Sequence, residues 1–383
     1  MKKFFITWLW ALLAVPLLAE NITFSETYYM LKRGDVWNLT ISGAENISVN
    51  LRCERTGKIS RITPVNGTYQ IKTDNDGFYT LLIKDPAGKE LKSHEFAAVS
   101  RIPDLVFWDC PVGQRYVTDR QIWPDKDGQD WLHRHVSNLR WAPGLKGRPA
   151  DLAAMTQKYA ERLKEFDGIL IDEFYMVKDF YPYQLDVVSP AIIAAAKQQP
   201  HKKLYAWMTT PDPDCTVINE AIKAAVDLVL VEIYIGNFMG YDAISGEWDL
   251  AVKSGWADKA IVGLGIGRDW ITTGKEAFNQ IREVKKRIPE SRGIGFFGDG
   301  SNAIVMRGID EGIRKYFIMP VVMYQPNGKT VSNSGSMEAR QLEVICQDGS
   351  KVVINSLPVG KTVTLDKAID RIPASKYYTV LEK

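Results

Sequence analysis

Two adjacent acids end an apolar segment near the middle of the chain. Residues 166–174 read FDGILIDEF, so Asp172 and Glu173 directly follow three aliphatic residues. A carboxylate that is buried without a partner costs several kcal/mol, or it takes up a proton. A chain that brings two acids to the end of a buried strand therefore either pairs them with cations for structural reasons or uses them in acid–base chemistry.

A third acid interrupts another apolar segment, residues 227–236, which read DLVLVEIYIG. Side chains alternate along a strand, so Leu230, Glu232 and Tyr234 share one face while the other face is purely aliphatic. The aliphatic face suits a layer of helices, and Glu232 then points to the interior of a barrel. We predict a functional carboxylate at this position. The alternative is a structural ion pair, for which Arg140 is the candidate partner.

Two carboxyl groups across a cleft supply the chemistry of glycoside hydrolysis. One group, kept protonated by an apolar setting, donates its proton to the leaving oxygen, and the other attacks the anomeric carbon or activates water. We predict Asp172, Glu173 and Glu232 as the catalytic residues; the sequence leaves open whether Asp172 or Glu173 is the proton donor. Aromatic, acidic and basic residues at the predicted strand ends are the candidate substrate-binding residues: Trp108, Asp109, Trp141, Tyr175, Trp207, Tyr234, Arg268 and Asp299.

These residues fall at the ends of segments in which strand-like and helix-like patterns alternate. Between the apolar segments, apolar residues recur at helical spacing, often behind a Ser, Thr or Asp that could cap a helix. Repeated strand–helix units imply a parallel sheet, and eight strands over roughly 220 residues match an α/β fold, the (β/α)8 TIM-like barrel, whose functional residues lie where the strands end. No convincing helix follows the last predicted strand, so we expect the barrel to be irregular at its last unit. The predicted strands are 104–110, 137–144, 166–174, 203–210, 227–236, 259–267, 292–300 and 316–324.

The sequence pattern divides the rest of the chain into flanking modules. Residues 1–19 place two lysines before a short apolar run, which is the layout of a signal peptide and predicts a secreted or periplasmic protein with no stable membrane span after cleavage. Residues 20–100 contain about seven short alternating segments between turn signals, which predicts an immunoglobulin-like β-sandwich. The catalytic barrel then spans 101–325, and 326–383 form a small C-terminal β-module.

The segment around the paired acids resembles a signature of secreted glycoside hydrolase barrels, including the chitinase-like and endo-α-galactosaminidase-like groups. The chitinase-like pattern is DGxDxDxE, and Asp167, Gly168 and Asp172 match it. Leu170 stands where that pattern has its middle acid, and Phe174 stands where it has the catalytic glutamate. This departure argues against substrate-assisted chitinase chemistry. The resemblance implies a carbohydrate-active barrel with a carbohydrate substrate.

Composition and motifs argue against several other classes of protein. A formal net charge of +2 gives no argument for nucleic acid as a partner. The partial GxGxxG pattern in 263–269 is better explained by glycines that leave room for the backbone at a strand end than by a dinucleotide site. Four scattered cysteines without CxxC spacing predict lone thiols, and we predict no cofactor and no metal. Two alternatives stay open: a non-catalytic carbohydrate-binding barrel, and a metal-dependent phosphodiesterase-type hydrolase with His133 and His135 as candidate ligands.

Overall fold

The computed structural model describes most of the chain. The described residues are 22–108, 114–122, 134–143, 151–172, 174, 185–236, 239–266, 270–298 and 300–383. The predicted signal peptide lies outside them. The described residues fall into two compact units, one within Met1–Ile102, Leu132–His135 and Ser336–Glu338, and the other within Pro103–Trp131, Val136–Gly335 and Ala339–Lys383.

The first unit contains strands and no helix in its described residues. The strands are β1 (Thr23–Phe24), β2 (Met30–Lys32), β3 (Val36–Leu39), β4 (Ile41–Ser42), β5 (Ser48–Cys53), β6 (Ile59–Ile62), β7 (Tyr69–Lys72), β8 (Gly77–Lys84) and β9 (Glu90–Val99). A five-stranded sheet has the order β2-β9-β8-β5-β6, and β1 pairs with β4 and β3 with β7. Trp37, Leu81 and Phe96 are buried in its core. The predicted β-structure is confirmed, and its immunoglobulin-like type stays a prediction.

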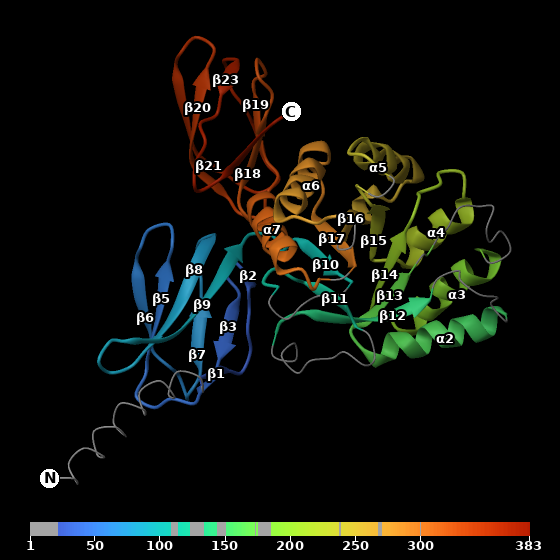
Figure 1. The fold of residues 1–383 in the computed structure, drawn as a ribbon, viewed down its shortest axis with the longest axis horizontal. Helices are drawn as coiled ribbons and strands as arrows, with labels where there is room; N and C mark the ends of the chain where they lie inside the picture. The colour runs from blue at the N-terminus through green and yellow to red at the C-terminus, as the bar shows by residue number, and fades with distance from the viewer. Residues whose placement is uncertain are drawn as a thin grey trace, which may run out of the picture. The chain divides into compact units, whose positions relative to one another are not determined.

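Eight parallel strands close a barrel in the second unit (Figure 1). They are β10 (Asp104–Phe107), β11 (Asp119–Ile122), β12 (Ser137–Pro143), β13 (Gly168–Asp172), β14 (Lys203–Met208), β15 (Leu228–Ile233), β16 (Ala260–Ile266) and β17 (Gly293–Gly298). The barrel closes because β17 pairs with both β16 and β10. The predicted fold class is confirmed.

The prediction of the barrel strands needs two corrections. The second strand, β11, was not predicted, because its sequence DRQI is polar although Asp119 and Gln121 are at most 4% exposed. The predicted strand 316–324 is not part of the barrel. Its first residues belong to a π-helical turn, η3 (Arg314–Ile318), and its last residues form β18 (Val321–Tyr324) in another sheet. The apolar run hides this change of structure, because an apolar run without periodicity fits a buried helix as well as a strand.

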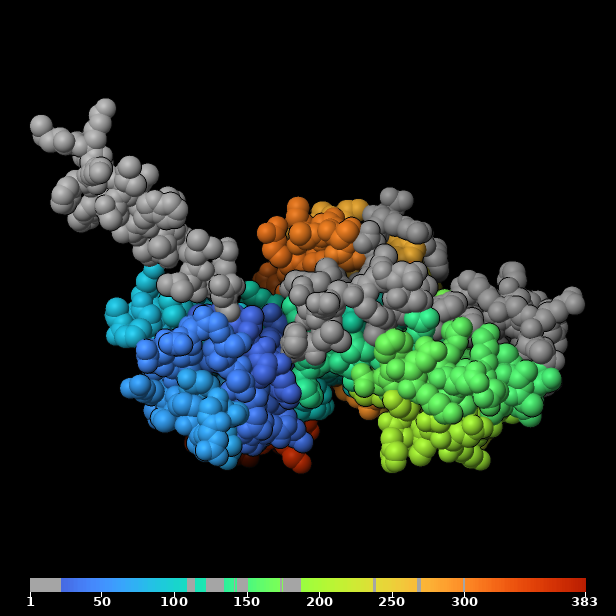
Figure 2. All heavy atoms as spheres, turned by 90° about the horizontal axis from the view of Figure 1, so that it is seen from below, coloured from blue at the N-terminus to red at the C-terminus, as the bar shows by residue number. Residues whose placement is uncertain are grey.

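Six helices cover the barrel in the described residues. They are α2 (Leu152–Glu165), α3 (Leu185–Gln198), α4 (Thr216–Ala225), α5 (Asp242–Ser254), α6 (Gly274–Arg287) and α7 (Ala303–Ile313). The outer surfaces of α2, α3 and α4 lie side by side, in green and yellow-green in Figure 2. Side chains cap several of these helices as predicted; Asp151 accepts a hydrogen bond from the backbone of Ala154, and Thr273 forms a capping box with Glu276. Helix α7 follows the last strand, so the expected irregularity at the last unit is wrong.

The C-terminal residues of the second unit form two small sheets. One contains β18, β19 (Thr330–Asn333), β22 (Thr362–Thr364) and β24 (Thr379–Glu382), and the other contains β20 (Ala339–Cys346), β21 (Lys351–Leu357) and β23 (Ile369–Arg371). Val322, Leu342 and Ile354 are buried in one core that joins the two sheets. The hairpin predicted from the sequence QPNGKTV is confirmed by the antiparallel pair β18 and β19. Among the described residues, Cys53, Cys215 and Cys346 are free thiols.

Candidate active site

Layers of side chains fill the interior of the barrel, beginning at the end where the strands start. Alternate strands contribute to the same layer of a (β/α)8 barrel. The strand registers place Val106, Leu139, Tyr205 and Ile261 in one layer, and Gln121, Leu170, Leu230 and Gly295 in the next. The following layer contains Trp108, Trp207 and Gly263, together with position 141 of β12, whose side chain lies outside the described residues. Trp207 has no exposed surface and Trp108 only 7%, so these indoles form a closed aromatic floor.

Glycines make room for this floor. A Cβ atom at Gly263 would lie 2.1 Å from Cζ3 of Trp207, and one at Gly295 would lie 2.3 Å from Cδ2 of Leu230. The missing side chains on β16 and β17 are therefore what lets a large indole from β14 cross the barrel. The sequence predicted that the glycines of 263–269 leave room for the backbone at a strand end, but Gly263 lies in the middle of β16 and leaves room for the Trp207 side chain instead.

Two of the predicted catalytic acids occupy the layer above the floor. Leu170 and Leu230 belong to the interior cluster, and side chains alternate, so Asp172 and Glu232 face the interior one layer nearer the strand ends. Asp172 is partly exposed and Glu232 is 9% exposed. Strands β13 and β15 are separated by β14 alone, which puts their backbones about 9 Å apart. The two carboxyl groups therefore approach the mouth of the barrel from nearby strands.

Several predicted site residues lie outside the described residues. These are Glu173, Asp109, Tyr175, Arg268 and Asp299, together with the side chain of Trp141. Their predicted roles stay predictions. Phe174 is described and fully buried, and its backbone N–H donates to the carbonyl oxygen of Trp207, so the backbone of β13 is still held against β14 two residues after Asp172.

Three aromatic rings meet beside Glu232, and the sequence analysis missed two of them. Tyr234, which was predicted, is stacked on Trp270 with ring centroids 4.8 Å apart and on Phe297 at 5.6 Å. Phe297 also meets Trp108 edge-on at 4.7 Å, so the cluster continues into the floor. Phe297 shares its interior layer with Asp172 and Glu232, and alternation along β17 was the signal that could have found it. Trp270 lies in the loop before α6, where no periodicity applies.

The ion pair considered for Glu232 is not formed by Arg140. The Arg140 guanidinium lies 3.5 Å from the Glu165 carboxylate at the end of α2. Leu139 faces the barrel interior, so its neighbour Arg140 faces the helices. Arg140 therefore points away from the barrel interior and pairs with a residue of α2.

A second polar cluster closes the opposite end of the barrel. Asp119 accepts hydrogen bonds from Lys203 Nζ at 2.6 Å and from the Tyr205 hydroxyl at 3.3 Å. Burial raises the pKa of Tyr205 above its usual range, and the charge of Asp119 adds to the effect. These groups lie at the beginning of their strands, where polar clusters in this fold serve stability.

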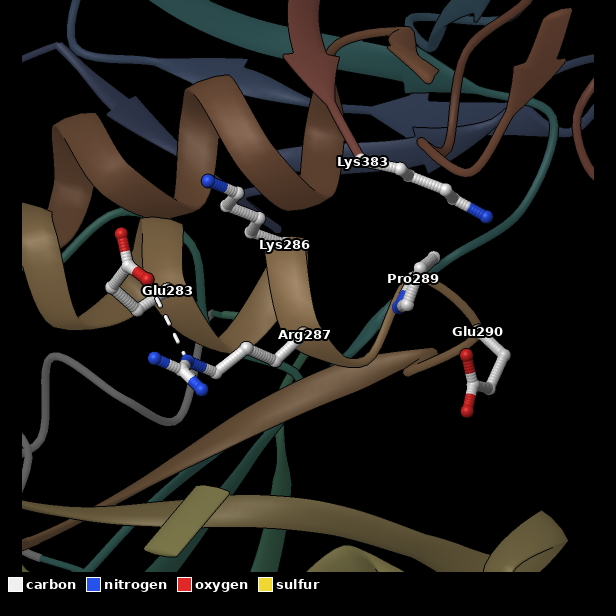
Figure 3. A pocket seen from close by; sticks show the side chains of 6 residues that line it. All are labelled: Glu283, Lys286, Arg287, Pro289, Glu290 and Lys383. Carbon is white, nitrogen blue, oxygen red and sulfur yellow. Dashed lines mark ion pairs between the residues drawn. The ribbon is translucent and has the colours of Figure 1, made fainter. Parts of the chain in front are cut away.

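An open pocket of about 580 Å³ lies at the C-terminal end of α6 (Figure 3). The Arg287 guanidinium forms an ion pair with Glu283 at 3.6 Å and another with Asp242 at 3.2 Å. The pocket is beside the start of β17, whereas the carboxyl groups described above are near the strand ends, so it plays no part in this site. Its lining residues are Glu283, Lys286, Arg287, Pro289, Glu290 and Lys383.

Of the two predicted metal ligands, only His135 is among the described residues. Its ring stacks on Tyr28 with centroids 4.4 Å apart, in the first unit. His133 lies outside the described residues. Within the described part of the chain no three His, Cys, Asp or Glu side chains are grouped as metal ligands, and no helix is long and apolar enough to span a membrane.

Comparison with known proteins assigns neither a family nor an activity to this chain. No family model and no curated protein matches the sequence. A structure from Bacteroides fragilis described as an α-galactosidase/melibiase aligns over 90% of this chain and 96% of its own, with 10% identity and a TM-score of 0.39. The glycoside hydrolase domain of PgaB from Bordetella bronchiseptica aligns over 55% of this chain and 88% of its own, with 12% identity and a TM-score of 0.38. An FMN-binding β-glucuronidase from Facaelibacterium prausnitzii aligns over 94% and 73%, with 8% identity and a TM-score of 0.37. These similar structures are glycoside hydrolases, but at such values they assign no activity to this chain.

Proposed function

We propose that this protein is a glycoside hydrolase whose catalytic carboxyl groups are Asp172 and Glu232, assisted by Glu173. One observation carries the proposal: the barrel brings Asp172 and Glu232 to the same interior layer, on alternate strands, directly above an aromatic floor. The substrate is a poly- or oligosaccharide.

The arrangement suits a two-carboxylate mechanism. One carboxyl group protonates the glycosidic oxygen, and the other attacks the anomeric carbon or deprotonates the attacking water. The floor of Trp108 and Trp207 excludes water from below, which strengthens the electrostatic interactions of the carboxyl groups with a charged transition state. The distance between the two carboxyl groups in the substrate complex decides between retention and inversion at the anomeric carbon.

The first experiment is a screen of the purified protein against aryl glycosides and polysaccharides, followed by the variants Asp172→Asn, Glu173→Gln and Glu232→Gln. We expect Asp172→Asn and Glu232→Gln each to lower turnover by about 100-fold or more, with unchanged thermal unfolding. The matched control is Glu165→Gln, a carboxylate on the outside of the barrel, and it should keep wild-type turnover.

Three outcomes would contradict the proposal. Wild-type turnover in both Asp172→Asn and Glu232→Gln would remove the catalytic assignment. Binding of a sugar without hydrolysis of any substrate in the screen would favour a carbohydrate-binding barrel. Activity that is lost in EDTA and restored by a divalent cation would favour a metal-dependent hydrolase.

We also propose that the protein is exported and acts outside the cytoplasm. The support is the charged and apolar pattern of residues 1–19. N-terminal sequencing of the protein recovered from a secreting host should begin after Ala19. A product that retains Met1 in the cytoplasm would contradict export.

A further inference from the structure

Trp270 occupies a space that the sequence of β16 leaves open for it. A Cβ atom at Gly265 would lie 2.3 Å from Cε3 of Trp270 and 3.0 Å from Cδ1 of Tyr234. No real side chain tolerates such contacts, so glycine at this position is what allows the indole to lie against the strand. The indole comes from the loop between β16 and α6, and the space that accepts it is built into the barrel.

The three rings at this point form a flat surface two rings wide. Trp270 and Phe297 are both nearly parallel to Tyr234, at 15° and 20°, and their own centroids are 6.2 Å apart. Atoms in contact lie about 3.5 Å apart, so rings on opposite faces of a third ring would be separated by about 7 Å or more. The shorter separation places Trp270 and Phe297 on the same face of Tyr234, side by side. We call the surface formed by Trp270 and Phe297 the aromatic platform.

The aromatic platform lies next to the proposed catalytic carboxyl groups. Phe297 shares the interior layer of Asp172 and Glu232, and Tyr234, which supports the platform, follows Glu232 by two residues, directly after the end of β15. Tyr234 is 9% exposed, whereas Trp270 and Phe297 are both partly exposed. Part of Trp270 and part of Phe297 are therefore available to a ligand, while Tyr234 packs against both.

A pyranose ring fits this combination of surfaces. One face of the ring presents C–H groups that stack on flat aromatic side chains, while its hydroxyl groups lie at the edge, where carboxylates accept their hydrogen bonds. We propose that the aromatic platform is a sugar-binding subsite that holds one pyranose ring against Trp270 and Phe297, next to Asp172 and Glu232. The inference rests on the proposed function for its substrate class and adds two residues that position the substrate.

The test is binding rather than turnover, so that it does not depend on catalysis. Saturation-transfer NMR is recorded with the methyl glycosides of glucose, galactose, N-acetylglucosamine and N-acetylgalactosamine on the full protein. At least one should bind, with the strongest saturation on the C–H protons of a single ring face. Trp270→Ala removes half of the platform and should weaken binding roughly tenfold. Gly265→Ala keeps every platform atom but displaces the indole, and it should weaken binding in the same way.

Phe278→Ala is the matched control. Phe278 is a partly exposed aromatic residue on α6 that packs against Tyr316 at 5.4 Å, away from the platform, and its removal should leave binding unchanged. The platform is refuted when wild-type protein binds none of the four sugars, or when folded Trp270→Ala binds them as tightly as wild type. Binding that depends on Trp270, in a protein whose turnover is absent or insensitive to Glu232→Gln, keeps the platform and rejects the hydrolase proposal.

Discussion

At the scale of single residues, Asp310 on α7 shows how burial and hydrogen bonding compete. Its carboxylate accepts a hydrogen bond from Gln114 Nε2 at 2.7 Å and further hydrogen bonds from the backbone N–H groups of Arg115 and Tyr116. These donors and the Arg115 charge favour the ionised form. Burial outweighs them and raises the pKa of Asp310 from 3.8 to about 6. Asp310 thus connects the segment after β10 to α7 by hydrogen bonds, although its buried carboxylate loses part of its hydration.

The sign of this pKa shift predicts a pH dependence of stability. Because the folded pKa is raised, the contribution of Asp310 is fully present below about pH 4 and is lost as the pH rises to about 6, by at most about 3 kcal/mol. Asp310→Asn removes this titration. Urea unfolding at pH 4 to 7 should therefore show a smaller decline in the variant than in wild type. Equal declines in both proteins would contradict the assignment.

At the scale of elements, close approach between β13 and β14 depends on one glycine. A Cβ atom at Gly168 would lie 2.0 Å from the carbonyl oxygen of Lys203, which is part of the backbone and cannot rotate away. Gly168 is the glycine of the motif that precedes Asp172, so the site and the packing of its strand share the same short segment. The pairing of β13 and β14 therefore requires glycine at position 168.

Gly168→Ala is accordingly expected to lower the free energy of unfolding by about 3 kcal/mol, because strands β13 and β14 must separate. The matched control is Gly246→Ala on α5, where a Cβ atom meets nothing within 4 Å. That change should raise the free energy of unfolding by about 0.5–1 kcal/mol, because alanine is the better helix former. Denaturant unfolding of both variants checks the pair. An unchanged free energy of unfolding in Gly168→Ala would contradict the close contact between β13 and β14.

At the scale of the whole molecule, the first unit includes residues from two later parts of the chain. Asp76 accepts hydrogen bonds from the Ser100 hydroxyl and from the backbone N–H of Glu338, each at 2.7 Å. Arg33 lies 3.7 Å from Asp76 and 3.8 Å from Glu338. The segment Ser336–Glu338 is separated from Asp76 by the entire barrel in sequence, and a buried aspartate holds it in the first unit.

Asp76→Ala should lower the free energy of unfolding by about 1–3 kcal/mol, because it leaves two partly buried donors without an acceptor. Asp74→Ala, in the same turn but exposed, is the control and should change stability by less than about 0.5 kcal/mol. Thermal and denaturant unfolding of the two variants provide the comparison. Equal effects would mean that Asp76 contributes no more than a surface charge.

Much of the barrel was predictable because its signals are local. Apolar segments such as 227–236 identify strands, alternation assigns Glu232 to the interior, and caps such as Asp151 mark where helices begin. Local sequence patterns gave the wrong answer in two segments. The polar strand β11 is recognisable only from its pairing with β10 and β12, and the apolar run 316–324 conceals a change from a π-helical turn to a strand of another sheet.

The sequence by itself determined that a parallel barrel of strand–helix units forms and that Glu232 faces its interior, because side-chain alternation and helical spacing are properties of neighbouring residues. Only the tertiary structure decided that Asp172 and Glu232 lie in one layer, that Arg140 pairs with Glu165 instead of Glu232, and that Trp270 rests on Gly265 beside Phe297. These facts depend on the register of strands distant in sequence and on where a loop returns, and neither is encoded in a local period.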